Sequence, residues 1–365
     1  MESLLAWYDR ERRILPWRED PTPYHVWISE IMLQQTRVEA VKGYYLRFLE
    51  ELPGIPDLAS AEEDRLLKLW EGLGYYSRAR NLKKAAQQIM EEYGGEMPSD
   101  AASLRKLPGI GPYTSAAIAS IAFGENVPAV DGNLLRIFAR MTGYSGDIRT
   151  DEAKKEAERW YRSVFSPVRP GDCNQALMDL GAAVCLPNGA PACGRCPWKD
   201  RCSAHRTGQE TLFPAAVPKK PRRREDRTVF LLRRGEGKDR KYALRKRPRK
   251  GLLAGLCEFP NAEGRMEEAE AAEWVRDMGF EPLEIVPAGD AKHVFTHIEW
   301  YMTGYLVDIA PAAESGVSGT SGESGALGSA AQENSLFFAG TEDLTERWSL
   351  PSAFSAYLKY ILRHS

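Results

Sequence analysis

The sequence predicts two domains, an all-α domain followed by an α+β domain, and three observations lead to this fold class. Apolar residues recur at helical spacing through residues 1–205, as at Leu66, Leu67 and Trp70. From residue 227 onward the helical pattern gives way to short β-rich segments. Between them, residues 206–226 contain three prolines among basic residues and no apolar period, which is typical of an inter-domain linker.

The second domain, residues 227–365, is expected to combine strands with helices. Strands are predicted at 228–233, 241–245 and 300–307, a helix at 267–278, and a closing helix near 351–363. Residues 311–335 consist almost entirely of Ser, Gly, Ala and Glu, so they are predicted to form a disordered surface insertion.

The composition is that of a globular chain, with 43% hydrophobic and 27% charged residues. No stretch reaches the length of a membrane span and the N-terminus lacks the features of a signal peptide, so we expect a cytoplasmic protein. The net charge is −2, but residues 219–250 hold 16 Lys/Arg against four Asp/Glu. Such a block either follows nucleic-acid phosphates or forms a solvated basic linker and strand.

A glycine-bearing turn is predicted at residues 107–114, which read L-P-G-I-G-P-Y-T. Gly109 breaks the first helix, and Gly111 lets the backbone approach a partner before the second helix begins. Free N–H groups in such a turn bind a phosphate oxygen, or a cation that bridges to one. Asp131 follows in V-D-G-N. The alternative is an ordinary corner between helices with a surface Asp.

Four cysteines at the end of the helical domain form the pattern C-x7-C-x2-C-x5-C. They are Cys185, Cys193, Cys196 and Cys202. Disulfides are improbable in a cytosolic chain, so metal binding is the better interpretation. By spacing alone, structural zinc and a [4Fe–4S] cluster are equally good candidates.

Taken together, the turn, V-D-G-N and the cysteines resemble the helix-hairpin-helix DNA glycosylases of the endonuclease III superfamily. Residues 29–36, S-E-I-M-L-Q-Q-T, look like the catalytic motif of its adenine-specific MutY branch. The resemblance implies a helix-hairpin-helix glycosylase domain that ends in an iron–sulfur loop at 185–202, with a [4Fe–4S] cluster on the four cysteines. The first cysteine gap is seven residues here and six in the family.

Glu30 is the candidate general acid. On a helix its neighbours Val26, Trp27 and Leu33 would desolvate its carboxyl and raise its pKa, although an isolated helical Glu is usually a surface residue. By resemblance, Glu30 protonates adenine and Asp131 stabilises the cationic sugar. Asn133 would hold Asp131 or the water.

Tyr113 occupies the place at which endonuclease III carries a Schiff-base lysine. A tyrosine cannot form an imine, so the resemblance implies a monofunctional glycosylase without lyase activity. We expect the ring or hydroxyl of Tyr113 to lie against the sugar.

Further positions are assigned by resemblance alone. Residues expected to enter the duplex near the partner base are Gln34, Gln35, Leu73 and Tyr75, and those expected to face the extruded adenine are Arg18 and Gln175. Residues 227–365 resemble a Nudix-like reading domain. Its Phe295-Thr296-His297 is similar to an F-S-H motif that contacts 8-oxoguanine. The Nudix helix counterpart, residues 272–279, has Ala272 and Arg276 at motif positions, which disfavours pyrophosphohydrolase activity.

The sequence therefore predicts a monomeric adenine DNA glycosylase of base excision repair, acting on A:8-oxoguanine or A:G mispairs in double-stranded DNA and not on membranes. Two alternatives stay open. One is an oxidised-pyrimidine glycosylase/lyase of the endonuclease III type, which Tyr113 opposes. The other is a non-catalytic iron–sulfur DNA-binding module, which the retention of both Glu30 and Asp131 opposes.

Overall fold

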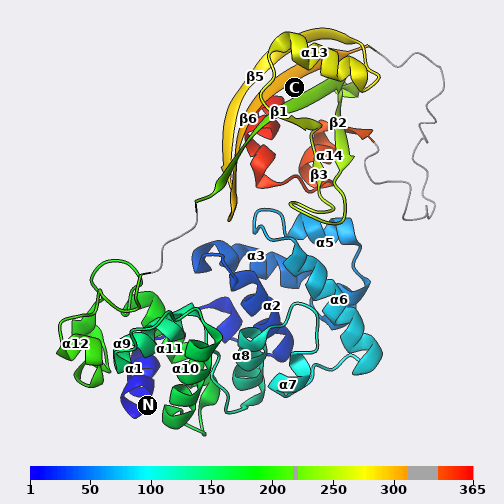
Figure 1. Cartoon of the computed structure of the whole chain (residues 1–365). Helices are drawn as coiled ribbons and strands as arrows, with labels where there is room; N and C mark the ends of the chain where they lie inside the picture. The colour runs from blue at the N-terminus through cyan, green and yellow to red at the C-terminus, as the bar shows by residue number, and fades with distance from the viewer. Residues whose placement is uncertain (217–220, 311–335, 365) are drawn as a thin grey trace. The chain divides into compact units, whose positions relative to one another are not determined.

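The chain folds into two compact units in a computed structural model that describes residues 1–216, 221–310 and 336–364 (Figure 1). The first unit comprises Met1–Ala61 and Ser77–Lys219, and the second comprises Glu62–Tyr76 and Lys220–Ser365. The first is helical and the second contains a seven-stranded mixed sheet, so the predicted fold class is confirmed. The insertion predicted at 311–335 lies outside the described residues.

The first unit is built from helices joined by short turns. They are α1 (Glu2–Glu11), α2 (Pro23–Leu33), α3 (Val38–Glu51), α4 (Ile55–Ser60), α6 (Ser77–Glu92), α7 (Ala101–Leu104), α8 (Pro112–Phe123), α9 (Gly132–Thr142), α10 (Asp151–Val164), α11 (Pro170–Ala183) and α12 (Ser203–Arg206), with 3₁₀ turns at Pro16–Arg18, Cys193–Arg195 and Lys199–Arg201.

Helix α8 lies at the centre of this unit. It is rich in small and apolar residues, every residue from Thr114 to Ser120 is buried, and it packs between α2 and α11. Helix α10 shows the opposite pattern, because it buries only Ala153, Ala157 and Tyr161 along one face. The small, mostly apolar side chains on all sides of α8 therefore suit a position between two helices.

The second unit contains strands β1 (Arg223–Arg234), β2 (Lys241–Lys246), β3 (Cys257–Glu258), β4 (Asn261–Glu263), β5 (Pro282–Val294), β6 (Ile298–Ile309) and β7 (Leu336–Gly340). The order is β3-β2-β1-β6-β5, with β4 paired to β1 and β7 to β2. Strands β1 and β6 run parallel, and the other pairs are antiparallel. The helices are α5 (Glu63–Leu69), α13 (Glu268–Asp277), α14 (Thr341–Glu346) and α15 (Ser355–Arg363), with 3₁₀ turns at Gly237–Asp239 and Ser352–Phe354.

Helices cover both faces of this sheet, because alternate residues of β1 point in opposite directions. Val229 and Leu231 pack in a core that includes residues of α14 and α15. Phe230 and Leu232 pack on the other side with α13, and the Trp274 ring stacks on Phe230 at 4.1 Å between centroids. Figure 1 shows α13 outside the sheet and α14 on its inner side. Both faces are therefore buried, which explains the continuous apolar run of β1.

Strand β1 begins at Arg223, inside the stretch predicted to be linker. The strand extends this far because its backbone pairs in parallel with β6, starting from the hydrogen bond donated by Arg223 N to His297 O at 2.9 Å. Strand β5 was not predicted from its mixed polar sequence. Its pairing with β6 along almost its whole length stabilises it instead.

Residues 62–76 belong with the second unit although they precede it by more than a hundred residues. Polar contacts hold them there. Lys246 Nζ lies 2.7 Å from Asp64 Oδ1, and Leu350 N donates to Glu71 Oε1 at 2.8 Å. No local sequence pattern predicts that residues 62–76 pack with the second unit.

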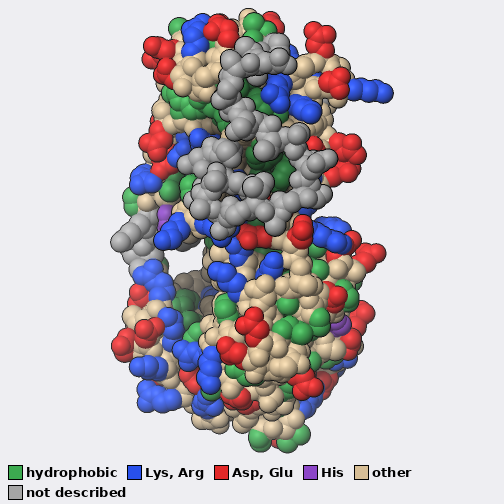
Figure 2. Space-filling view, turned by 90° about the vertical axis from the view of Figure 1, so that its right-hand side faces the viewer, with side chains coloured by type: hydrophobic (Ala, Val, Ile, Leu, Met, Phe, Trp, Pro, Cys, Tyr) green, Lys and Arg blue, Asp and Glu red, His purple; other side chains and the backbone are tan. Residues whose placement is uncertain are grey.

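Several basic side chains of the run at 219–250 form ion pairs with carboxylates. Arg223 and Arg227 pair with Glu225, Arg233 with Asp308, and Arg245 with Glu258. In Figure 2, blue and red side chains intermix over the second unit where grey atoms do not cover it. Part of the run is therefore a strand surface with internal ion pairs, and a role in following phosphates stays a prediction.

Candidate active site and cysteine loop

Glu30 lies on α2 with its carboxyl buried. Its side chain belongs to the last turns of a helix whose residues from Tyr24 to Met32, apart from His25, are all buried, and Glu30 itself is 5% exposed. Burial is the main reason why the pKa of Glu30 rises to about 7, and the nearby Asp131 charge raises it further. The carboxyl is thus poised to hold or release a proton near neutral pH.

Tyr113 contacts this carboxyl directly. It is the second residue of α8, and its hydroxyl donates a hydrogen bond to Glu30 Oε2 at 2.7 Å. Burial raises the pKa of Tyr113 well above its ordinary value, so the hydroxyl stays protonated and remains a donor. The sequence predicted a place for Tyr113 against the sugar, but gave no sign of its bond to Glu30.

Asp131 is held at the N-terminus of α9. Its Oδ1 accepts from Leu134 N at 2.8 Å, which caps the helix, and its Oδ2 accepts from Asn133 Nδ2 at 2.9 Å. Burial raises the pKa of Asp131, whereas these donors favour the ionised carboxylate. The contact between Asn133 and Asp131 that the sequence suggested is therefore present.

Arg136 connects this carboxylate to the cysteine loop, a role that the sequence did not reveal. Its Nη2 donates to Asn133 Oδ1 and to Gly181 O, both at 2.9 Å, and its Nε donates to Cys185 O at 2.8 Å. The Arg136 side chain is buried, like the other residues from Leu134 to Arg140 of α9. A continuous series of hydrogen bonds thus leads from the Asp131 carboxylate through the side chains of Asn133 and Arg136 to the backbone oxygen of Cys185.

Arg18 is fixed by Asp179, another residue that the sequence did not single out. The guanidinium binds both carboxylate oxygens of Asp179, at 2.8 and 3.0 Å, and Arg13 binds the same carboxylate. Burial would raise the pKa of Asp179, but the bonds and charges of the two arginines outweigh it and hold the pKa below its usual value. Gln175 lies on α11, the helix that carries Asp179, and is half-buried.

The glycine turn lies between α7 and α8, as predicted. Gly109 has φ +78°, and a Cβ there would lie 2.7 Å from Asn81 Cβ, so conformation and space both require glycine. Gly111 caps α8 with φ −87°, and no atom lies within 4 Å of where its Cβ would be. The exposed backbone of this turn is therefore open to a partner.

The residues after α2 are prepared for contact in different ways. Gln34 Nε2 donates to Thr114 Oγ1 at 3.2 Å, which ties it to α8. Gln35 is exposed and has φ +57°, a strained value for a residue with a side chain. This strain points to a functional position.

In the second unit, the predicted Phe295-Thr296-His297 motif forms the turn between β5 and β6. Thr296 and His297 are exposed, and the Phe295 ring packs edge-on against Trp300 at 4.9 Å. Tyr75 shares a 2.7 Å hydrogen bond with Thr296 Oγ1, and its own φ is +47°. Leu73, two residues earlier, is buried.

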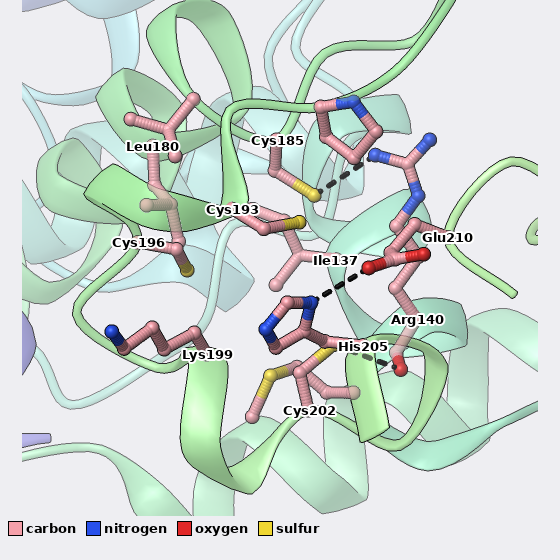
Figure 3. A pocket seen from close by; sticks show the side chains of 13 residues that line it. Ile137, Arg140, Leu180, Cys185, Cys193, Cys196, Lys199, Cys202, His205 and Glu210 are labelled. Atoms are coloured by element: carbon pink, nitrogen blue, oxygen red, sulfur yellow. Dashed lines mark hydrogen bonds and ion pairs between the residues drawn. The ribbon is translucent and has the colours of Figure 1, made fainter. Parts of the chain in front are cut away.

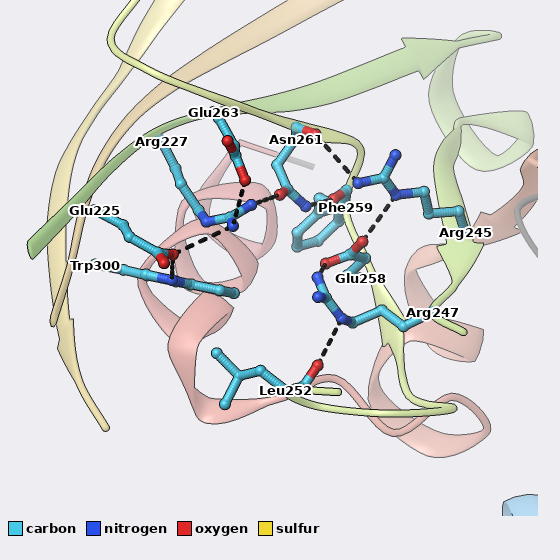
Figure 4. A network of polar contacts seen from close by, with 10 residues as sticks. All are labelled: Glu225, Arg227, Arg245, Arg247, Leu252, Glu258, Phe259, Asn261, Glu263 and Trp300. Atoms are coloured by element: carbon cyan, nitrogen blue, oxygen red, sulfur yellow. Dashed lines mark hydrogen bonds and ion pairs between the residues drawn. The ribbon is translucent and has the colours of Figure 1, made fainter. Parts of the chain in front are cut away.

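A polar network surrounds Trp300, the residue on which this turn packs (Figure 4). Trp300 Nε1 donates to Glu225 Oε2 at 2.8 Å, and the Arg227 guanidinium lies 4.4 Å above the Trp300 ring. Arg245 and Arg247 both bind Glu258, whose side chain is 2% exposed. The Trp300 ring against which Phe295 packs is therefore held in one orientation.

The four predicted cysteines line one cavity between α9, α11 and α12 (Figure 3). Arg140 Nη1 donates to Cys185 Sγ at 3.2 Å, and Cys202 Sγ donates to Arg140 O at 3.3 Å. His205 and Glu210 line the same cavity, and the sequence gave no reason to include them. Cys173 and Cys257, outside the pattern, are buried elsewhere.

The four thiols offer a donor set that either a zinc ion or an iron–sulfur cluster can use. In one tetrahedral zinc site they would lie about 3.8 Å apart, given zinc–sulfur bonds of about 2.3 Å. Within the described part of the chain, only Cys193 belongs to a set of three donor atoms within 4.8 Å of one another, and its partners are not cysteines.

Comparison with known proteins agrees with the fold. The sequence profile of the HhH-GPD superfamily of base excision DNA repair proteins matches residues 28–163, and that of the NUDIX domain matches residues 228–359. A solved thermostable thymine-DNA glycosylase is 29% identical, with a TM-score of 0.52, and the match covers 56% of this chain and 94% of that one. The class is thus a helix-hairpin-helix base-excision protein with a Nudix-like domain.

Whole-chain relatives narrow this class. The adenine DNA glycosylase of Homo sapiens is 37% identical over 353 residues, covering 81% of this chain and 64% of the human protein. That of Buchnera aphidicola subsp. Baizongia pistaciae (strain Bp) is 33% identical, covering 82% and 84%. The chain belongs to the adenine DNA glycosylase family. It spans a little under two thirds of the length of its human relative.

Among the residues described, none of the helices has the length and apolar character needed to cross a lipid bilayer.

Proposed function

We propose that this chain is a monofunctional DNA glycosylase that hydrolyses the N-glycosidic bond of adenine paired with 8-oxoguanine or guanine in double-stranded DNA. The observation that carries the proposal is Glu30, a buried carboxyl with a pKa of about 7 that accepts a hydrogen bond from Tyr113. The relatives bear the name adenine DNA glycosylase, and the superfamily profile matches residues 28–163, which include Glu30 and Tyr113.

The two carboxyls have opposed roles in this mechanism. Protonated Glu30 gives its proton to the base, so that adenine leaves as a neutral molecule, and its carboxylate then directs water. Asp131, held by Leu134 N and Asn133, remains charged beside the sugar and stabilises its positive charge. Both carboxylates are fixed before the reaction, so little reorganisation is needed in the transition state.

Tyr113 limits the reaction to base removal. Its hydroxyl is bound to Glu30 and has no amine chemistry, so no Schiff base forms at this place. Single-stranded breaks are therefore not part of the proposed reaction.

The four cysteines would hold a [4Fe–4S] cluster. The donor set of four thiols around one cavity supports this assignment, together with the family to which the chain belongs. When bound, the cluster supplies a rigid anchor for the loop that carries Arg195, Lys199 and Arg201. Arg140 and Arg136 then hold the Cys185 end of this loop through Cys185 Sγ and O.

Specificity for the partner base would come from the exposed turn at Thr296 and His297, with Tyr75 hydrogen-bonded to it. Arg18 and Gln175 would face the extruded adenine, and the turn at Gly109 and Gly111 would bind the DNA backbone. We further propose that the chain acts as a monomer in the cytoplasm, associated with DNA.

The test compares duplexes that contain A:8-oxoguanine, A:G and thymine glycol:A. Release of adenine from the first two without strand cleavage is expected, and Glu30→Gln should abolish it, with Glu50→Gln on the surface of α3 as the matched control. Release of thymine glycol together with covalent capture by borohydride would instead identify an endonuclease III-type lyase. DNA binding without any base release would identify a non-catalytic module.

A further inference from the structure

The cavity of the cysteine loop contains a second donor set of a different kind. Cys193 Sγ and ligand atoms of His205 and Glu210 all lie within 4.8 Å of one another. His205 Nδ1 and Glu210 Oε1 are 2.6 Å apart, and their side chains are 38% and 20% exposed. Figure 3 shows all three side chains around the same cavity, beside Arg140 and Cys202.

Backbone hydrogen bonds bring the oxygen and nitrogen donors together. Helix α12 ends after Arg206, and the chain turns back through bonds from Gly208 N to His205 O at 3.2 Å and from Gln209 N to Ala204 O at 2.8 Å. Glu210 is thereby placed over the imidazole of His205. The pair is formed by local structure and does not depend on the other cysteines.

We propose that Cys193, His205 and Glu210 form a site for one Zn²⁺ ion, and that the ion occupies this site when the cysteine loop carries no cluster. Thiolate, imidazole and carboxylate are the three ligand types that zinc prefers in proteins. One thiolate and one carboxylate balance the two positive charges of the ion, and water completes a tetrahedral shell. Binding needs a small rearrangement, in which the distance between the ligand atoms of His205 and Glu210 increases by about 1 Å.

The site and the cluster exclude each other because both use the Cys193 sulfur. This exclusion rests on the cluster assignment in the proposed function, whereas the zinc site itself does not. The neighbouring basic side chains, unlike a bound cluster, do not prevent zinc binding. Arg140 is directed to Cys185 and Leu186 O, and Lys199 is an exposed chain that lines the cavity. Metal content therefore has two alternative states, one with iron and one with zinc.

The first experiment uses the full chain with Cys196→Ser, which removes a cluster ligand but keeps the three donors. Titration with Co²⁺, a spectroscopic substitute for zinc, should give one ion per chain and a sulfur-to-cobalt charge-transfer band that Zn²⁺ removes. Adding His205→Ala should weaken Co²⁺ binding at least tenfold. Adding His364→Ala, an exposed histidine in the other unit, should leave it unchanged. Equal binding by the His205 variant and its control would overturn the proposal.

The second experiment does not require loss of a cluster ligand, so it remains decisive if Cys196→Ser does not fold. Wild type and His205→Ala are produced in iron-poor medium with zinc, and in iron-rich medium, and metals are counted by mass spectrometry. We expect His205→Ala to lose the zinc but to keep the same iron content as wild type. Zinc retained by His205→Ala refutes the zinc site. Iron absent from both proteins refutes only the cluster assignment.

Discussion

Replacement of Glu30 by Gln should remove base excision and, at alkaline pH, make the folded protein more stable. Gln has nearly the same shape and stays neutral at every pH, whereas the buried Glu30 must become charged when the pH rises. The catalytic proton and the instability thus have one origin, the desolvation of this carboxyl.

The size of the effect follows from the two pKa values. Folding raises the pKa of Glu30 from its ordinary value of 4.5 to about 7. At about 1.4 kcal/mol for each pH unit between these values, the difference is about 3 kcal/mol. Because the folded-state pKa is the higher one, this stability is fully present below pH 4.5. It is lost progressively as the pH rises to about 7, and Glu30→Gln should avoid the loss.

The assay is urea unfolding followed by far-UV circular dichroism, to which the helical first unit contributes most. Wild type, Glu30→Gln and the surface control Glu50→Gln are compared at about pH 5 and about pH 8. The free energy of unfolding of Glu30→Gln relative to wild type should increase by at least about 2 kcal/mol between the two conditions. A difference that is the same at both pH values would show that Glu30 is not the buried, proton-carrying group described above.

Three further outcomes test the site. Tyr113→Phe removes the donor that favours the Glu30 carboxylate, so the alkaline limb of the single-turnover rate should move to higher pH; an unmoved limb contradicts the bond. Arg136→Met leaves buried carbonyls without a donor, at a cost of about 1–3 kcal/mol each, and should lower both cluster content and base release. Wild-type values of both, measured by absorbance and glycosylase assay, would exclude the connecting role. Gly109→Ala should destabilise by about 1–3 kcal/mol in urea unfolding, because its φ of +78° and the neighbouring side chain oppose a Cβ. Gly111→Ala, with open space around it, should cost far less, so equal losses would contradict this reasoning.

Local patterns predicted part of the site. The helix around Glu30 follows from its apolar neighbours and the glycine turn follows from Gly109 and Gly111, whereas the resemblance was needed to favour a buried Glu30 over a surface one. The resemblance then selected Asp131 as the partner. These features depend on residues that are close in sequence, or on a motif that already contains them.

Contacts between distant segments could not be predicted in the same way. The bond from Tyr113 to Glu30 spans 83 positions, and Arg136 reaches Cys185 across 49. Arg18 and Asp179 are 161 positions apart. A sequence period reports which face of a helix is buried, but not which side chain of another helix meets it. The ion pairs of the basic run could not be predicted for the same reason, since carboxylate partners such as Asp308 and Glu258 come from other strands.

The carboxylate of Asp131, at the start of α9, has two roles, because it caps the helix and supplies a negative charge to the site. One oxygen closes the first turn of the helix and the other accepts from Asn133, so the side chain is locked without any contribution from substrate. Asparagine caps a helix about as well as aspartate does. Asp131→Asn can keep the helix cap through its single amide oxygen, but it removes the acceptor for Asn133 Nδ2 together with the charge. This position therefore measures what the charge and that one bond contribute together to breaking the glycosidic bond, separately from the stability of the helix.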